Sequence, residues 1–155
     1  PDMGEYGDGD EIPIDYSGKL FIVEGYSIRN TFNITTLPQF AASKMYNDEL
    51  CVAILANGKY RFSYLKYGEN KFGYHIKTYG NNGRVPAFRW SPSQGKFVQS
   101  TATGILIHMG WNRSNFNNPA SLGCILIKKE QWYEFQNSLG MISGTLIIYG
   151  PNRHG

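Results

Sequence analysis

The chain has 155 residues and a formal charge of +3, with 41% hydrophobic and 15% aromatic residues. This length suits one domain whose core needs no disulfide or metal. The weak, scattered positive charge argues against nucleic-acid binding and suits a loose attraction to an anionic polymer. No apolar run approaches the roughly 18 residues of a membrane-spanning helix. The 18 glycines and many aromatic side chains favour β structure with frequent turns.

The first third of the chain predicts a lead-in, a strand and a helix. Residues 1–15 are acidic and glycine-rich without periodicity, so we expect a flexible lead-in to a single domain at 16–155, with no visible signal peptide. The apolar run at 19–23 predicts a strand. Thr36 near an N-cap and Pro38 in the first turn predict a helix that ends near Asn47.

A series of short strands follows, separated by turn residues. Asn57-Gly58 is a strong hairpin signal and predicts that the strands on either side of it pair with each other. Such close spacing predicts a meander of neighbouring strands. The predicted strands cover residues 50–55, 59–67, 71–79, 84–90 and 96–99.

The last third holds two apolar runs, each with a reactive side chain at one end. His108 lies near the end of the run 104–110, which predicts a central strand buried on both faces. Cys124 opens the second run. The segment 111–120 between them is rich in Asn, Ser and Pro and predicts a loop. A second helix is predicted at 129–139 and a last strand at 144–149.

Neighbouring strand ends would bring the His108 imidazole to the Cys124 thiol, where the imidazole takes the thiol proton and activates the sulfur. The small residues Ser121 and Gly123 let a substrate approach closely. Backbone N–H groups of Leu122, Gly123 and Cys124 would then face a developing oxyanion. Alone, a histidine or cysteine on an apolar run is more often an inert core residue. The combination favours catalysis.

The pattern His108…Ser121-x-Gly123-Cys124-Ile125 resembles the active-site signature of the L,D-transpeptidase catalytic domain, with a separation of 124 − 108 = 16 residues. The resemblance implies that Cys124 is the nucleophile and His108 its base. It also implies a mostly β fold, an L,D-transpeptidase-like β-sandwich or mixed sheet with two peripheral helices. The implied substrates are the peptide stems of bacterial peptidoglycan, which places the protein in the periplasm or outside the cell.

Two positions depart from this signature. The family often has His between Ser and Gly, where this chain has Leu122. It usually has Arg, sometimes Asn or Thr, two residues after the cysteine, where this chain has Leu126. That polar residue helps to hold the site and the acidic substrate. The chain is therefore interpreted as a divergent member whose reaction outcome is cross-linking, exchange or trimming of stems.

Other side chains are candidates for holding the substrate. A guanidinium matches a carboxylate, which makes Arg84, Arg89 and Arg113 candidates, with Arg113 favoured because it lies between the two reactive runs. Trp111 and Tyr74 would line a sugar or peptide groove, although packing explains them equally well. Tyr79 and Trp90 have the same two interpretations.

Alternative functions remain open at this point. One is a secreted antibacterial effector or phage enzyme of the same fold, with an immunity protein as a partner. Another is a non-catalytic β-sandwich module that binds glycans through aromatic side chains. Only two cysteines are present, Cys51 and Cys124, without closely spaced ligand pairs, so no metal or cofactor is predicted. Cys51 is interpreted as a buried small hydrophobe.

Overall fold

The computed structural model describes residues 11–13, 16–36, 53–69, 71–78, 84–91, 93–110, 113–115 and 124–150. Strands dominate these residues, which confirms the prediction of a mostly β protein. The single α-helix of the described ranges is α1 (Trp132–Leu139), entered through the 3-10 turn η3 (Lys129–Gln131). Nowhere in these ranges is a helix long and apolar enough to cross a membrane.

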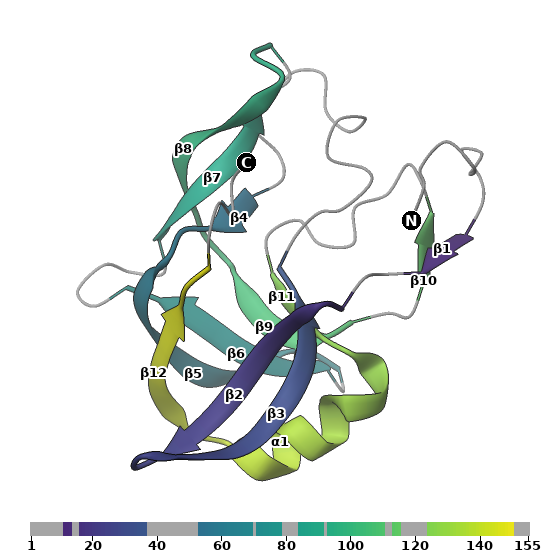
Figure 1. Ribbon diagram of the computed structural model, residues 1–155, viewed down its shortest axis with the longest axis vertical. Helices are drawn as coiled ribbons and strands as arrows, with labels where there is room; N and C mark the ends of the chain where they lie inside the picture. Colours follow the sequence, from purple (N-terminus) through teal and green to yellow (C-terminus); the bar gives the residue numbers. More distant parts are fainter. Residues whose placement is uncertain are drawn as a thin grey trace.

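A curled mixed sheet of seven strands forms the body of the molecule, in the order β12-β5-β6-β9-β11-β3-β2 (Figure 1). Its neighbours pair antiparallel, except β9 and β11, which are parallel. β9 is central, as predicted for the run before His108, but it is not buried on both faces, because Leu106 and His108 are only half-buried. The strands are β2 (Gly18–Glu24), β3 (Ser27–Thr35), β5 (Gly58–Gly68), β6 (Lys71–Lys77), β9 (Leu106–Met109), β11 (Ile125–Ile127) and β12 (Ser143–Ile148).

Two smaller sheets complete the described structure. One has the order β4-β7-β8 and consists of β4 (Ala53–Leu55), β7 (Val85–Ser91) and β8 (Lys96–Ala102). It lies beyond one end of the large sheet in Figure 1, opposite α1. The other is a single antiparallel pair of β1 (Glu11–Pro13) and β10 (Arg113–Asn115).

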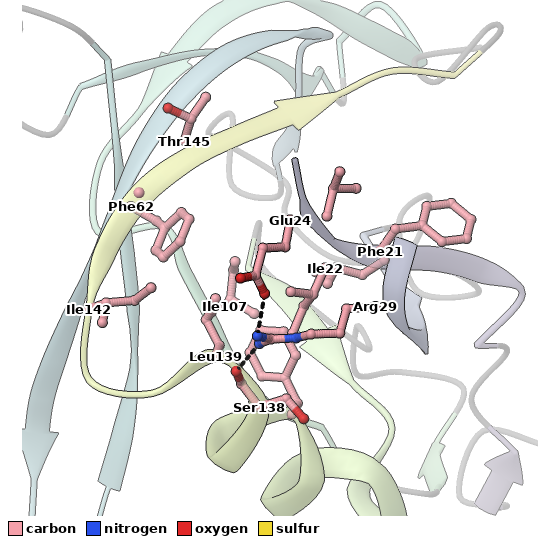
Figure 2. A pocket seen from close by; sticks show the side chains of 14 residues that line it. Phe21, Ile22, Glu24, Arg29, Phe62, Ile107, Ser138, Leu139, Ile142 and Thr145 are labelled. Atoms are coloured by element: carbon pink, nitrogen blue, oxygen red, sulfur yellow. Dashed lines mark hydrogen bonds and ion pairs between the residues drawn. The ribbon is translucent and has the colours of Figure 1, made fainter. Parts of the chain in front are cut away.

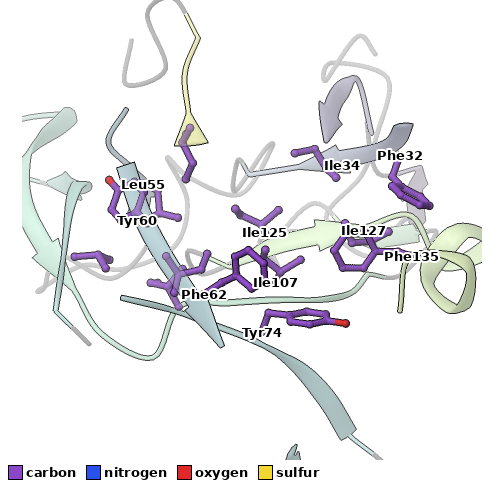
Figure 3. Close-up of a cluster of buried hydrophobic side chains, with 14 of the residues drawn as sticks. Phe32, Ile34, Leu55, Tyr60, Phe62, Tyr74, Ile107, Ile125, Ile127 and Phe135 are labelled. Carbon is purple, nitrogen blue, oxygen red and sulfur yellow. The ribbon is translucent and has the colours of Figure 1, made fainter. Parts of the chain in front are cut away.

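The core lies on the inner face of the curled sheet, where alternate residues of the strands meet α1 (Figure 3). On β5, Tyr60 and Phe62 are buried while Lys59 and Arg61 are exposed, which is the period of two expected of a strand with one wet face. Phe135 of α1 packs edge-on against Phe32 of β3, with ring centroids 5.2 Å apart. Tyr74 of β6 is fully buried and its ring lies 5.6 Å from that of Phe135. These aromatic contacts pack the helix against the inner face of the sheet.

The predicted meander is wrong in its pairing. β4 does not pair with β5 across Asn57-Gly58; it pairs with β7, and its place beside β5 is taken by β12. The Asn57 side chain donates to the Gly150 carbonyl at 2.8 Å, and Gly58 stands opposite Ile148. Asn57-Gly58 therefore directs the chain from the small sheet to the large one. Strands β6 and β7 also lie in different sheets, whereas β5–β6 and β7–β8 are hairpins.

Further predictions need correction. The segment 111–120 is not all loop, because 113–115 forms β10, and the predicted lead-in contains β1. A two-stranded pair is held by backbone hydrogen bonds, which polar residues form as well as apolar ones. Strand β3 was not predicted, since only its second half alternates clearly. The helix expected at 129–139 is confirmed by η3 and α1. The helix expected from Thr36 to Asn47 lies outside the described residues, apart from Thr36 itself. The prediction of two helices is therefore not confirmed.

Candidate active site

His108 and Cys124 come from the two parallel strands at the centre of the large sheet. His108 stands opposite Leu126, while Ile107 stands opposite Ile125 and points into the core. By the alternation of a strand, His108 faces the outer side of the sheet. Cys124 directly precedes β11, two residues before Leu126, and so shares that outer side. From the usual strand spacing and rise, the two Cα atoms are roughly 8 Å apart, close enough for their side chains to meet.

The imidazole of His108 is oriented by a backbone carbonyl. Its Nδ1 lies 2.9 Å from the Met109 carbonyl oxygen. A carbonyl can only accept, so Nδ1 carries the proton and Nε2 presents a lone pair. Burial lowers the pKa of His108, and the hydrogen bond to Met109 opposes this shift. The carbonyl that orients the ring thus belongs to the residue directly after the histidine.

Cys124 forms no disulfide with any described residue and lies directly before β11, beside Leu106 at the beginning of β9. Its Sγ accepts a hydrogen bond from the Leu106 N–H at 3.4 Å and lies 4.0 Å from the Gly104 carbonyl oxygen. Burial raises the pKa of the thiol, and the Leu106 N–H opposes this shift because it favours the thiolate. The raised thiol pKa and the lowered imidazole pKa both favour the neutral forms of the two groups.

Tyr67 and Gly73 complete the surroundings of His108 and were missed in the sequence. The Tyr67 ring centroid lies 6.1 Å from that of His108, with the planes tilted by 59°. Burial and the negative charge of a Cys124 thiolate both raise the pKa of Tyr67, which places the phenol within electrostatic range of the sulfur. A Cβ at Gly73 would lie 3.3 Å from Tyr67 Cε1 and 3.4 Å from His108 Cβ. A glycine inside the alternating strand was the available signal of close approach.

Leu126 stands where the resembled family usually carries arginine. Its side chain is only 2% exposed, and a Cβ at Gly110 would meet Leu126 Cβ at 2.9 Å. The Gly110 N–H donates to the Ile127 carbonyl at 2.8 Å, which holds the end of β9 against β11. The Tyr16 hydroxyl lies at the same glycine, and burial, with a smaller effect of the Glu130 charge, raises its pKa to about 12. Leu126 is thus a packing residue.

Among the other predicted site residues, Tyr74, Arg84 and Arg113 lie within the described ranges. Tyr74 lies in the core, on the opposite face from His108, and its hydroxyl donates to the Gly140 carbonyl at 2.8 Å. It is therefore withdrawn as a groove residue. Arg84 is exposed beside the small sheet and donates to Thr101 Oγ1 at 2.7 Å. Arg113 lies in β10, opposite Pro13. Trp111, Ser121, Leu122, Gly123 and Cys51 lie outside the described residues.

A cavity of about 440 Å³ opens between the edge strands β2 and β12, on the inner face of the sheet (Figure 2). Ile22, Phe62 and Ile107 line its apolar part. Arg29 at its border pairs with Glu24 at 2.8 Å and donates to a carbonyl at the end of α1. Because Ile107 faces this cavity, His108 faces away from it. The cavity and the Cys–His pair therefore lie on opposite faces of one sheet.

Within the described ranges, no three His, Cys, Asp or Glu side chains come together as metal ligands would. The groups described on the outer face include the Cys124 thiol, the His108 imidazole and the Tyr67 phenol. No protein-family model, curated protein or solved structure matches this chain.

Proposed function

We propose that this protein is a cysteine-dependent acyltransferase of the L,D-transpeptidase type, acting on the peptide stems of bacterial peptidoglycan in the periplasm or outside the cell. The observation that carries the proposal is the position of Cys124 and His108 on one face of two adjacent parallel strands, with Nδ1 of His108 tied to a carbonyl. The curled mixed sheet supports an L,D-transpeptidase-like fold as part of the same proposal.

The first half of the reaction forms a thioester. Nε2 of His108 takes the thiol proton as Sγ of Cys124 attacks the carbonyl carbon of an L,D-linked residue. The tetrahedral intermediate then collapses, its C–N bond breaks, and the imidazolium gives its proton to the departing amine. The acyl group remains on Cys124, and the terminal D-residue leaves.

The second half transfers the acyl group to an acceptor. An amine or a water molecule attacks the thioester while Nε2 of His108 removes its proton. The C–S bond breaks, and the imidazolium returns the proton to the sulfur. An amine from another stem yields a cross-link, a free D-amino acid yields an exchanged stem, and water yields a trimmed stem.

The test is mass spectrometry of purified muropeptides after incubation with the protein. We expect the wild type to shift stem masses, and we expect Cys124→Ala and His108→Gln to abolish the shift while keeping the folded circular-dichroism spectrum. His75→Gln is the matched control, because His75 lies on the same face but one strand farther from the sulfur, and it should retain turnover. Full turnover by Cys124→Ala would end the proposal.

A further inference from the structure

The outer face of the β5–β6 hairpin is basic. Alternation places Lys59 and Arg61 of β5 on this face, together with Lys71 and Lys77 of β6. The inward-facing residues between them, such as Tyr60 and Tyr74, are buried, which fixes the assignment of the two faces. Neither strand contains an acidic residue. The face therefore carries positive charge without a negative side chain of its own strands.

Two of these cations stand directly opposite each other. Arg61 pairs with Lys77 in the β5–β6 ladder. Like charges at opposed positions destabilise a sheet, because their side chains are held a few ångströms apart. His75, on the same face, has a pKa lowered by burial and then by the charge of Lys77. The charge of Lys77 therefore acts on His75, which stands opposite Leu106 of β9.

The ladder places Lys77 nearer the sulfur than Arg61, which lies one strand farther away. The Ile76 N–H donates to the Ile105 carbonyl at 2.9 Å, which brings Lys77 alongside Gly104. The Gly104 carbonyl in turn lies 4.0 Å from Sγ of Cys124. With a strand spacing of about 4.8 Å, the Lys77 Cα is roughly 10 Å from the sulfur. The long arm of a lysine spans much of that distance, so its ammonium can meet a group bound next to the thiol.

We propose that Arg61 and Lys77 form a carboxylate-binding subsite, which holds the free carboxylate of an acidic peptide beside Cys124. The identity of the ligand rests on the proposed function, in which the leaving residue carries its carboxylate close to the bond that is cleaved. A guanidinium and an ammonium on one face match that group. They supply the positive charge that an arginine would provide at the position of Leu126, two residues after the nucleophile.

The test compares two alkylating reagents that differ in one charge. The Cys124 sulfur displaces iodide from either iodoacetate, an anion, or iodoacetamide, which is neutral. Rates at Cys124 are read by peptide mass spectrometry, so that Cys51 does not interfere, and are divided by the rates with the neutral thiol N-acetylcysteine amide. We expect the wild type to prefer iodoacetate relative to this reference. Arg61→Gln and Lys77→Gln should each reduce the preference about two- to fivefold.

Lys66→Gln is the matched control. Lys66 lies on the same strand as Arg61, but its ammonium sits over the Phe72 ring, 5.7 Å from the centroid. The Lys66→Gln variant loses one positive charge, as Lys77→Gln does, but from the other face of the sheet. It should therefore keep the wild-type preference for iodoacetate. High salt should weaken the preference for iodoacetate in the wild type. It should leave the rate ratio unchanged in the double variant that carries both Arg61→Gln and Lys77→Gln.

The outcomes separate the two proposals. A preference that survives both Arg61→Gln and Lys77→Gln, or that falls equally in Lys66→Gln, would overturn the subsite and leave the proposed reaction standing. A Cys124 that reacts with neither reagent would overturn both. A reduced preference in the two variants, with muropeptides left unchanged by the wild type, would support an anion subsite and refute the peptidoglycan substrate.

Discussion

Replacing Gly73 with alanine tests whether the packing of Tyr67 on His108 supports the reactivity of Cys124. The new Cβ would meet the Ile107 carbonyl oxygen at 2.7 Å, as well as the edges of Tyr67 and His108. Because that oxygen belongs to the backbone of the neighbouring strand, it cannot move aside as a flexible side chain can. Overpacking of this kind costs about 2 kcal/mol, and removing a glycine from a strand returns about 0.7 kcal/mol. We expect a net loss of stability of about 1–2 kcal/mol.

The chemical effect should exceed the effect on stability. A displacement of His108 by a fraction of an ångström moves Nε2 away from the thiol, and we expect Cys124-dependent turnover to fall about tenfold or more. Urea denaturation gives the stability, and site-resolved alkylation against pH gives the reactivity of Cys124. Gly144→Ala is the matched control, because its Cβ would meet Phe62 Cζ at 2.7 Å on the inner face, far from the thiol.

Both glycine variants should lose stability, but only Gly73→Ala should change the alkylation profile. An unchanged profile in Gly73→Ala, with the expected loss of stability, would show that Tyr67 and His108 do not need this close contact. Tyr67 would then have no role in the reactivity of Cys124.

Three further predictions concern the same face and the helix. Tyr67→Ala should let water reach the Cys124 thiol and move its alkylation midpoint down towards the ordinary thiol pKa, whereas Tyr67→Phe should keep the wild-type midpoint. The free energy of unfolding should fall as the pH drops below about 6.5. The fold lowers the pKa values of His108 and His75 from 6.5, so the unfolded chain takes up those protons first. Denaturant titrations at several pH values, repeated with His108→Gln and His75→Gln, measure this slope. Arg29→Ala should cost about 0.5–1 kcal/mol in urea denaturation, because it removes a cation from the last turn of α1.

Each of these has a contrary result. Equal midpoints for the alanine and phenylalanine variants of Tyr67 would deny the ring a role in excluding water. A pH slope that persists in His108→Gln and His75→Gln alike would assign the acid sensitivity to other groups. Wild-type stability of Arg29→Ala would make its contact with the helix end neutral.

Much of the fold could be predicted locally. The alternation of Tyr60 and Phe62 with basic residues marked β5 and the side on which it is buried, since a strand places successive side chains on opposite faces. Trp132 and Phe135, three residues apart, marked the inner face of α1 in the same way. Partner choice was not predictable from these signals. Asn57-Gly58 has the composition of a hairpin, yet the edge of β5 is occupied by β12 from the far end of the chain.

The sequence by itself predicted an imidazole and a thiol on two apolar runs, because residue types and short-range pattern mark both strands and both side chains. The tertiary structure alone decided what surrounds them. The β5–β6 hairpin pairs with β9 through β6, a contact between residues far apart in the sequence. This pairing brings Tyr67 of β5 next to His108 and Lys77 of β6 alongside Gly104. Hydrophobic period encodes which side of a strand is buried, but register and neighbour depend on the packing of the whole sheet.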